Sequence, residues 1–239
     1  MKICLIPLQI EVRNPSKNLG HIEECLEKTS SYAPDLVCLP ECTLTGYLYE
    51  HDDLRKYSET IPGPTVDHMA QLAKAYGIYI CFGLIEATAT GIFNSAIILD
   101  RMGEVALIHR KIKEKPPFLT GNTLSCISIG GHRCGLFLCG DLFNTEVVQT
   151  IDRSLSMLIV PMARSFDDLS PDAARWENEE RQVYIEAVRS IGVPTIFVNA
   201  LETGSGAASF GGAMVISAQG ELLAESPHGT DQLIVWDFE

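Results

Sequence analysis

The chain has 239 residues, of which 46% are hydrophobic and 21% charged, and its net charge is -13. This size and balance predict one globular α/β domain over residues 1–239. The acidic excess excludes nucleic-acid binding as the main role, because no basic surplus is available to meet phosphates. No apolar run reaches the roughly 18–20 residues of a membrane span. The N-terminus also turns polar too soon for a secretory signal, so we expect a cytoplasmic protein with no membrane partner.

Eight cysteines raise the question of disulfides or a metal site. Cys38 and Cys42 lack the CxxC spacing of common zinc sites, and so do Cys134 and Cys139. No two histidines stand at a paired ligand spacing. We therefore predict reduced thiols, most of them buried, with no metal and no organic cofactor.

Strand and helix patterns alternate in the first third of the chain. Apolar runs predict strands, and apolar residues at three- to four-residue spacing predict amphipathic helices. In chain order these are a strand at 2–9, a helix at 18–32, a strand at 35–39 and a helix at 66–76. Pro34 ends the first helix and Gly77 closes the second.

Hairpin strands dominate the middle of the chain, and strands and helices alternate again after them. The hairpin group is predicted at 78–84, 94–99, 104–109, 124–129 and 134–138. The last third is predicted to hold helices at 146–155 and 171–191 and strands at 157–160, 195–199, 213–217 and 233–236. Proline-rich segment 110–122 is expected to be a loop, and glycine-rich segment 205–212 to be mobile. These patterns indicate an α/β domain with a mixed sheet system.

Cys139 stands where a short buried strand ends. The apolar run 136–138 stops there, and Gly140 follows. A cysteine in a sharp turn at a strand end is held out of the apolar interior, and the next backbone N–H can face the atom that the sulfur attacks. Two earlier stretches supply a base, Glu41, and a cation, Lys111. We therefore interpret Glu41, Lys111 and Cys139 as one active site.

These side chains suit the hydrolysis of a C–N bond by a nucleophile. A free thiol has a pKa of about 8.5, so it is mostly protonated at neutral pH and needs a base. Glu41 would take that proton, and Lys111 and the N–H of Gly140 would stabilise the oxyanion. Glu41 would then protonate the departing amine and activate water against the thioester. Asp141 is expected to brace the turn, and Cys139 to react quickly with thiol reagents near neutral pH.

Several motifs, in order along the chain, resemble those of the nitrilase, or carbon–nitrogen hydrolase, superfamily. The matching stretches are Leu39-Pro40-Glu41 with Thr45-Gly46-Tyr47, Asn94-Ser95-Ala96, Asp100 and Gly103, Arg110-Lys111, Gly135 to Phe143, Arg175-Trp176 to Arg181, Asn199, and Gly211 to Gly220. This resemblance implies a four-layer α-β-β-α sandwich, usually a homodimer or a larger homo-oligomer. It also implies a catalytic triad of Glu41, Lys111 and Cys139 that hydrolyses a small-molecule substrate without a cofactor, more commonly an amide than a nitrile.

The sequence departs from that family pattern in three places. Gly140 follows the cysteine, where an aromatic residue is common. The loop after Lys111 is shortened, and Glu114 is the residue in it that could serve as the family's second glutamate. The extension that many relatives use in dimer contacts is short or missing after the last predicted strand, so the oligomeric state stays open.

The identity of the substrate also stays open. Carbamoyl amino-acid hydrolases often carry an arginine shortly after the nucleophile, where this chain has Leu142 and Phe143. Arg164 is the remaining candidate for binding a substrate carboxylate, and an ordinary surface arginine is an equal alternative.

Two rival interpretations remain beside the hydrolase. In the first, a cysteine–histidine pair does the chemistry, with His109 or His132 as the base, although neither matches a position of the family motif. In the second, the chain is a non-catalytic or regulatory binding protein, because the shortened loop 111–121 does not complete the site.

Overall fold

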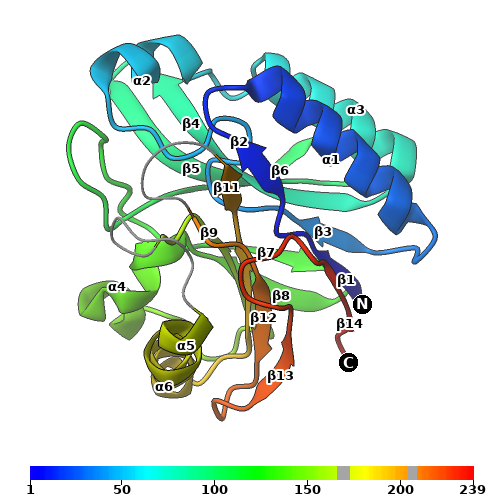
Figure 1. The fold of residues 1–239 in the computed structure, drawn as a ribbon, viewed down its shortest axis with the longest axis vertical. Coiled ribbons are helices and arrows are strands. Elements are labelled where there is room, and N and C mark those ends of the chain that lie inside the picture. Colours follow the sequence, from blue (N-terminus) through cyan, green and yellow to red (C-terminus); the bar gives the residue numbers. More distant parts are fainter. Residues whose placement is uncertain (166–172, 204–208) are drawn as a thin grey trace.

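The computed structural model describes residues 1–165, 173–203 and 209–239. Within these residues two six-stranded mixed sheets lie face to face, and helices cover the outer face of each sheet (Figure 1). This is the four-layer α-β-β-α sandwich that the sequence predicts. None of the helices in these ranges combines the length and the hydropathy that a bilayer crossing requires.

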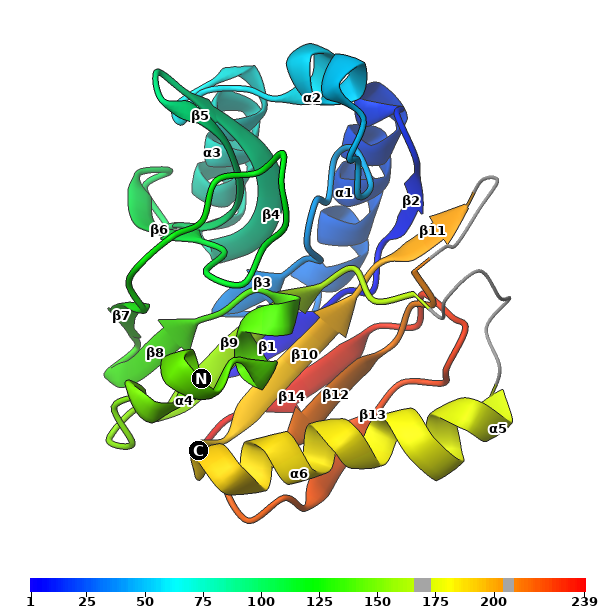
Figure 2. The ribbon, with the colours of Figure 1, turned by 90° about the vertical axis from the view of Figure 1, so that its left-hand side faces the viewer.

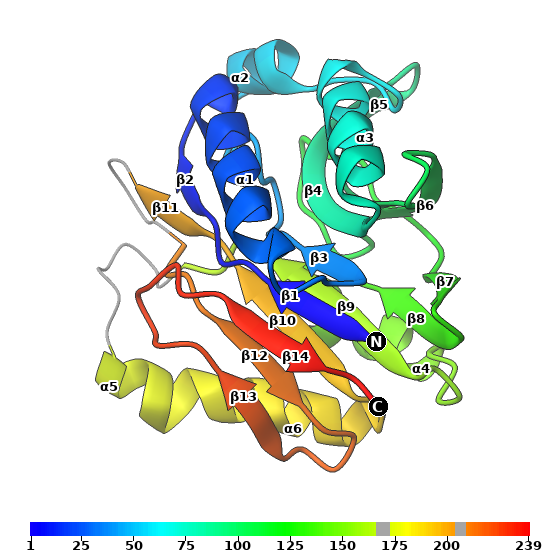
Figure 3. The same cartoon turned by 90° about the vertical axis from the view of Figure 1, so that its right-hand side faces the viewer.

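The first sheet comes from the N-terminal half of the chain and is completed by the last strand. Its order is β14 (Ile234–Asp237), β1 (Lys2–Leu5), β3 (Leu36–Cys38), β4 (Tyr79–Thr88), β5 (Gly91–Leu99) and β6 (Val105–Arg110). Helices α1 (Pro15–Ser30) and α3 (Pro64–Tyr76) cover its outer face, where Ile22 and Met69 are fully buried (Figure 3). The parallel strands β1, β3 and β4 are therefore linked by helical crossovers, as parallel pairs require.

The second sheet comes from the C-terminal half. Its order is β13 (Leu222–Glu225), β12 (Ala213–Ile216), β10 (Thr195–Asn199), β9 (Met157–Met162), β8 (His132–Leu136) and β7 (Ser125–Ile129). One continuous helix covers its outer face, made of α5 (Ala173–Arg175), the π-helical turn η2 (Trp176–Glu180) and α6 (Arg181–Ile191) (Figure 2). Val188 and Ile191 of this helix are buried against Phe197 of β10.

The interface between the sheets explains why the central strands are apolar throughout. Ile3 and Ile98 of the first sheet and Ile159 and Ile196 of the second belong to one buried cluster, so these strands have no solvent face. Polar side chains accumulate instead where the strands end. Strand β2 (Gln9–Glu11), which follows β1, pairs there with β11 (Leu201–Thr203), which follows β10. This two-stranded sheet joins the two halves of the molecule.

Most predicted elements are present, and the differences have local causes. The strand expected at 2–9 is two strands, β1 and β2, because the chain turns out of the sheet around Pro7. The helix expected at 146–155 ends at Gln149 (α4, Thr145–Gln149). A turn follows it, in which Asp152 accepts the backbone N–H of Ser154 at 2.9 Å.

Other predictions were incomplete or lie outside the described residues. The helix expected at 171–191 is described from Ala173 onward and contains the π turn. Helix α2 (His51–Tyr57) and the short strands β11 and β13 were not predicted from the sequence pattern. Residues 205–208 of segment 205–212, which was expected to be mobile, lie outside the described residues. That the whole chain is one domain stays a prediction.

Candidate active site

The candidate site lies at the seam between the sheets, where the loops after β3, β6, β8 and β9 meet. Glu41 comes three residues after β3, and Lys111 directly follows β6, so both come from the first sheet. Cys139 begins the short 3-10 helix η1 (Cys139–Phe143), which follows β8 of the second sheet. The structure therefore brings together, at one edge, residues that lie up to 98 positions apart in the sequence.

Glu41 is fully buried and fully engaged. Its Oε1 accepts hydrogen bonds from Lys111 Nζ at 2.7 Å and Asn94 Nδ2 at 2.7 Å. Its Oε2 accepts the backbone N–H of Ala163 at 2.9 Å, which crosses from the second sheet. Burial raises the pKa of Glu41, and the charge of Lys111 and the hydrogen bond from Asn94 partly offset that rise. This carboxylate is thus held in one orientation and made more basic than an exposed glutamate.

Lys111 is the cation at the centre of the same network. Its Nζ donates to Glu41 and also lies 3.2 Å from Oε2 of Glu114 and 3.0 Å from the Tyr47 hydroxyl. Burial alone would lower the pKa of Lys111, but the neighbouring charges of Glu41, Cys139 and Glu114 outweigh it and the pKa is raised. The ammonium therefore stays charged although only 7% of the side chain is exposed.

Glu114 reaches the site from the shortened loop. Its Oε2 accepts hydrogen bonds from the hydroxyl of Tyr47 and from Asn94 Nδ2, the latter at 3.0 Å. Burial would raise the pKa of Glu114, but Lys111 and the two hydrogen-bond donors lower it overall. The short loop thus places a second carboxylate against Lys111, where the sequence suggested one. Lys113 and Lys115 of the same loop are exposed, as expected of solvated charges.

Cys139 is partly exposed and has an unusual backbone. Its φ is 38°, in the left-handed region that residues with a Cβ rarely adopt. Burial and the charge of Glu41 raise the pKa of the Cys139 thiol to about 12, although Lys111 and the backbone N–H of Ala163 lower it. A thiol with this pKa is protonated at neutral pH. The raised pKa disfavours a free thiolate before substrate binds, and the expected fast reaction of this thiol stays a prediction.

Gly140 lies beside the lysine, as an oxyanion donor would. A Cβ built on Gly140 would lie 3.9 Å from Lys111 Cε and 3.8 Å from the carbonyl oxygen of Lys113. Both are ordinary van der Waals separations, so the position does not require glycine for space. The backbone after the cysteine therefore runs alongside the lysine side chain.

The two histidines of the cysteine–histidine alternative point elsewhere. His109 is fully buried, and its Nε2 lies 2.9 Å from Oδ2 of Asp141. His132 is at the start of β8, where its ring packs edge-on against Phe238, with centroids 5.0 Å apart. The candidate base near Cys139 is instead Glu41, whose negative charge acts on the thiol.

Arg164 follows Ala163 and is fixed by its backbone. Asn199 accepts the N–H of Arg164 at 2.7 Å and donates to its carbonyl oxygen at 3.1 Å. The guanidinium pairs with Glu180 of the π turn at 3.1 Å, and one third of the side chain is exposed. Its charge is among the influences that lower the pKa of Cys139. Arg164 is therefore a positioned arginine near the thiol.

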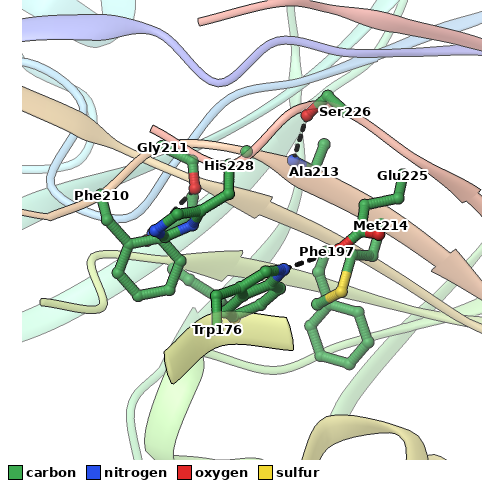
Figure 4. Close-up of a pocket in the computed structure, with 12 residues that line it drawn as sticks. Trp176, Phe197, Phe210, Gly211, Ala213, Met214, Glu225, Ser226 and His228 are labelled. Atoms are coloured by element: carbon green, nitrogen blue, oxygen red, sulfur yellow. Dashed lines mark hydrogen bonds between the residues drawn. The ribbon is translucent and has the colours of Figure 1, made fainter. Parts of the chain in front are cut away.

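An aromatic cluster anchors the helix that carries Glu180. The Trp176 ring stacks on His228, with centroids 5.4 Å apart, and its indole N–H donates to Glu225 at 2.7 Å (Figure 4). Phe210 packs beside both rings. The remaining cavity measures about 10 Å³, which is room for at most one water molecule. This cluster therefore serves to hold the helix.

Comparison with known proteins agrees with the geometry. A sequence model of the family described as carbon–nitrogen hydrolase matches residues 2–239. The chain is 25% identical to omega-amidase NIT2 from Bos taurus, with 98% of this chain and 87% of that protein covered. It is also 25% identical to a nitrilase from Pyrococcus abyssi, covering 80% of this chain and 76% of the relative.

Solved structures resemble the fold closely. Nit3 from Saccharomyces cerevisiae, a nitrilase superfamily member, superposes with a TM-score of 0.85 at 21% identity, covering 100% of this chain and 90% of that one. An amidase from Nesterenkonia sp. AN1 gives a TM-score of 0.82 at 20% identity, covering 100% and 93%. That amidase was captured, as a mutant, with acrylamide added to its active-site cysteine.

Proposed function

Because this chain belongs to the carbon–nitrogen hydrolase family, we propose that it hydrolyses a small amide through a thioester on Cys139. The observation that carries this proposal is the buried ion pair of Glu41 and Lys111, with 2.7 Å between Oε1 and Nζ, placed beside a cysteine at a strand end. A fixed base, a fixed cation and a nucleophile are the groups that acyl transfer requires.

Acylation begins from the neutral thiol. Because the pKa of Cys139 is about 12, Glu41 takes the proton as the sulfur bonds to the amide carbon, and no free thiolate accumulates. The carbonyl oxygen becomes an oxyanion that Lys111 and the N–H of Gly140 stabilise. Glu41 then passes its proton to the nitrogen, the C–N bond breaks, and ammonia or an amine leaves.

Deacylation uses the same base again. Glu41, now a carboxylate, removes a proton from water as the oxygen attacks the thioester carbon. Lys111 stabilises the second oxyanion, the C–S bond breaks, and the sulfur recovers the proton from Glu41. The sum is one amide and one water giving one acid and one ammonia or amine. Glu114 acts through Lys111, whose ammonium it contacts at 3.2 Å.

The substrate class follows from the charges near the thiol. The backbone of Arg164 is held by Asn199, and its side chain is partly exposed. The guanidinium can therefore donate hydrogen bonds to a substrate carboxylate while it remains near Glu180. An amide that also carries a carboxylate is therefore the preferred substrate class. The bovine relative is named an omega-amidase, which supports an amide as the substrate. Nitriles and carbamoyl compounds are the alternatives, and the expected homodimer or larger assembly stays a prediction.

The experiment is ammonia release from a panel of neutral amides, carboxylate-bearing amides, glutamine and N-carbamoyl amino acids. Cys139→Ala should abolish release, a loss of about 10⁴-fold or more. Cys126→Ala, which changes an exposed thiol, is the matched control and should retain full activity. Release that persists in Cys139→Ala would contradict the mechanism. A wild-type protein that binds panel members without hydrolysing them would favour the regulatory alternative.

A further inference from the structure

A second buried pair crosses the seam between the sheets. His109 lies in β6, two residues before Lys111, and Asp141 lies in η1, two residues after Cys139. Both side chains are 0% exposed, and His109 Nε2 is 2.9 Å from Asp141 Oδ2. The pair therefore joins the segment that carries the proposed lysine to the turn that carries the proposed nucleophile.

The two oxygens of the Asp141 carboxylate accept hydrogen bonds at all of their acceptor sites. Its Oδ1 accepts the backbone N–H groups of Ile112 at 2.9 Å and Lys113 at 2.8 Å. Its Oδ2 accepts the N–H of Leu138 at 3.2 Å in addition to the contact with His109. A carboxylate offers about four acceptor sites, so none is left over. Because the Asp141 carboxylate is the acceptor in all four contacts, Nε2 is the nitrogen of the His109 ring that carries the proton.

The donors define what the carboxylate holds. Two of the three backbone N–H groups directly follow Lys111, and the third directly precedes Cys139. One side chain therefore fixes both loops at once. This constraint includes the residue before Cys139 and so helps to keep the left-handed backbone conformation of Cys139.

The ring of His109 is tied to this arrangement by one nitrogen. Its other nitrogen, Nδ1, is buried and has no hydrogen-bond partner in the part of the chain that the structure describes. The ring packs near Phe137, with centroids 6.1 Å apart. The hydrogen bond from Nε2 is thus the polar contact through which this side chain acts on the site.

We propose that His109 is a positioning residue for the hydrolase: through Asp141 it sets the separation between the Lys111 ammonium and the Cys139 sulfur. This inference rests on the proposed function. Oxyanion stabilisation depends on that separation, whereas substrate affinity depends on groups elsewhere, such as Arg164. Loss of the contact should therefore lower kcat and leave KM nearly unchanged.

Two amide variants separate this role from simple packing. In His109→Gln the amide nitrogen can reach the position of Nε2, whereas in His109→Asn the shorter amide ends near the level of Nδ1. We expect His109→Gln to keep kcat within about threefold of wild type. His109→Asn should lose about thirtyfold or more in kcat with KM within about twofold. The kcat is expressed per active site, titrated by the first-turnover burst of ammonia, and Tm is measured for each variant.

A structural role would give a different pattern. If His109→Asn lowers Tm but keeps wild-type kcat per titrated site, or if both variants behave alike, the inference is overturned. Should His109→Asn fail to fold, His109→Met takes its place, since it fills similar volume without a donor. Parallel loss in His109→Gln and His109→Met would likewise overturn it.

Thiol alkylation tests the same geometry without turnover. Lys111 lowers the pKa of Cys139, so a displaced lysine should slow the reaction of Cys139 with iodoacetamide. The exposed Cys126 is the internal standard. The ratio of the Cys139 rate to the Cys126 rate should fall about threefold or more in His109→Asn and stay unchanged in His109→Gln. An unchanged ratio in both would overturn the inference, even if no hydrolysis is found and the proposed function fails.

Discussion

Two groups of residues, one from each sheet, form the candidate site, and they are held in different ways. Glu41, Lys111 and Glu114 follow strands of the first sheet and share a network of hydrogen bonds with Asn94 and Tyr47. The side chains of Glu41, Lys111 and Glu114 are each less than a tenth exposed. This first-sheet group is therefore fixed before any substrate arrives, which is the condition for electrostatic stabilisation of a transition state.

The second-sheet group is more exposed to solvent. Cys139 is partly exposed in a strained turn, and Arg164 is one third exposed in an ion pair with Glu180. These are the groups that would touch the scissile carbon and the rest of the substrate. We call the first-sheet group the rigid half and the second-sheet group the open half. Under the proposed function, the groups for charge stabilisation and proton transfer lie in the rigid half, and the groups that contact the variable part of the substrate lie in the open half.

Removing the base tests the rigid half most directly. Glu41→Gln should lower kcat by about 10³-fold, because general-base catalysis contributes about 10²–10⁴-fold. The same change should make Cys139 easier to ionise. After burial, the Glu41 charge is the largest cause that raises the thiol pKa to about 12, so its loss lowers that pKa and the alkylation rate should rise at a given alkaline pH.

The measurement is kcat together with iodoacetamide rates between pH 7 and pH 10. Glu86→Gln is the matched control, since Glu86 is also buried in the first sheet but pairs with Arg110. Slower alkylation in Glu41→Gln, or equal loss of kcat in Glu86→Gln, would mean that the first-sheet network acts through folding and not through the thiol.

A glycine beneath Glu41 tests how finely the base must be placed. Gly83 of β4 packs so closely that an added Cβ would lie 2.7 Å from Glu41 Cα and 2.6 Å from the backbone nitrogen of Cys42. Backbone cannot yield as a flexible side chain can, so Gly83→Ala should shift Glu41 and lower kcat by about a hundredfold.

Gly20→Ala provides the comparison for Gly83→Ala. Gly20 lies in helix α1, and nothing stands within 4 Å of an added Cβ there. This variant should keep full activity and a Tm equal to or above that of wild type. Full activity in Gly83→Ala, with thermal stability retained, would show that the rigid half tolerates displacement.

The rigid half was the easier one to predict from sequence. Glu41 and Lys111 stand at strand ends next to turn residues, and local pattern reveals such places. Cys139 of the second-sheet group was found by the same signal. Glu114 could be named because the shortened loop has no other glutamate. The strands that carry these loops were also predicted. Strand β3 is buried on both faces and leaves a continuous apolar run, and β6 is the return strand after a hairpin turn.

The contacts between the sheets could not be predicted, because they join residues that are distant in sequence. The N–H of Ala163 that binds Glu41 carries no signal in a side chain. Asn94 and Tyr47 stood in recognised motifs, yet their hydrogen bonds to Glu114 depend on how the loop folds back. The raised pKa of Cys139 follows from burial, which no local pattern measures.

The second carboxylate offers a smaller test of the rigid half. Glu114→Gln removes a charge 3.2 Å from Lys111 Nζ, so the ammonium is held less firmly for the oxyanion. We expect kcat to fall about tenfold, less than for a direct oxyanion donor, because Glu114 acts through Lys111. Glu50→Gln, an exposed change at the start of α2, should have no effect.

A double variant sharpens the Glu114 prediction. Tyr47 donates to Glu114 and accepts from Lys111, so the two residues share one network. Tyr47→Phe combined with Glu114→Gln should therefore lose less than the product of the two single losses. Strictly multiplicative losses in kcat would show that the two side chains act independently.

The open half is tested by an effect on KM that depends on the substrate. Arg164→Ala should raise KM about tenfold for a carboxylate-bearing amide and leave KM for a neutral amide nearly unchanged, because only the first loses a charge-assisted hydrogen bond. Arg133→Ala removes an arginine from an exposed pair with Asp152 and serves as the control. Equal effects of Arg164→Ala on both substrates would assign this arginine to structure, through Glu180. A selective effect would assign the choice of substrate to the more exposed, second-sheet group.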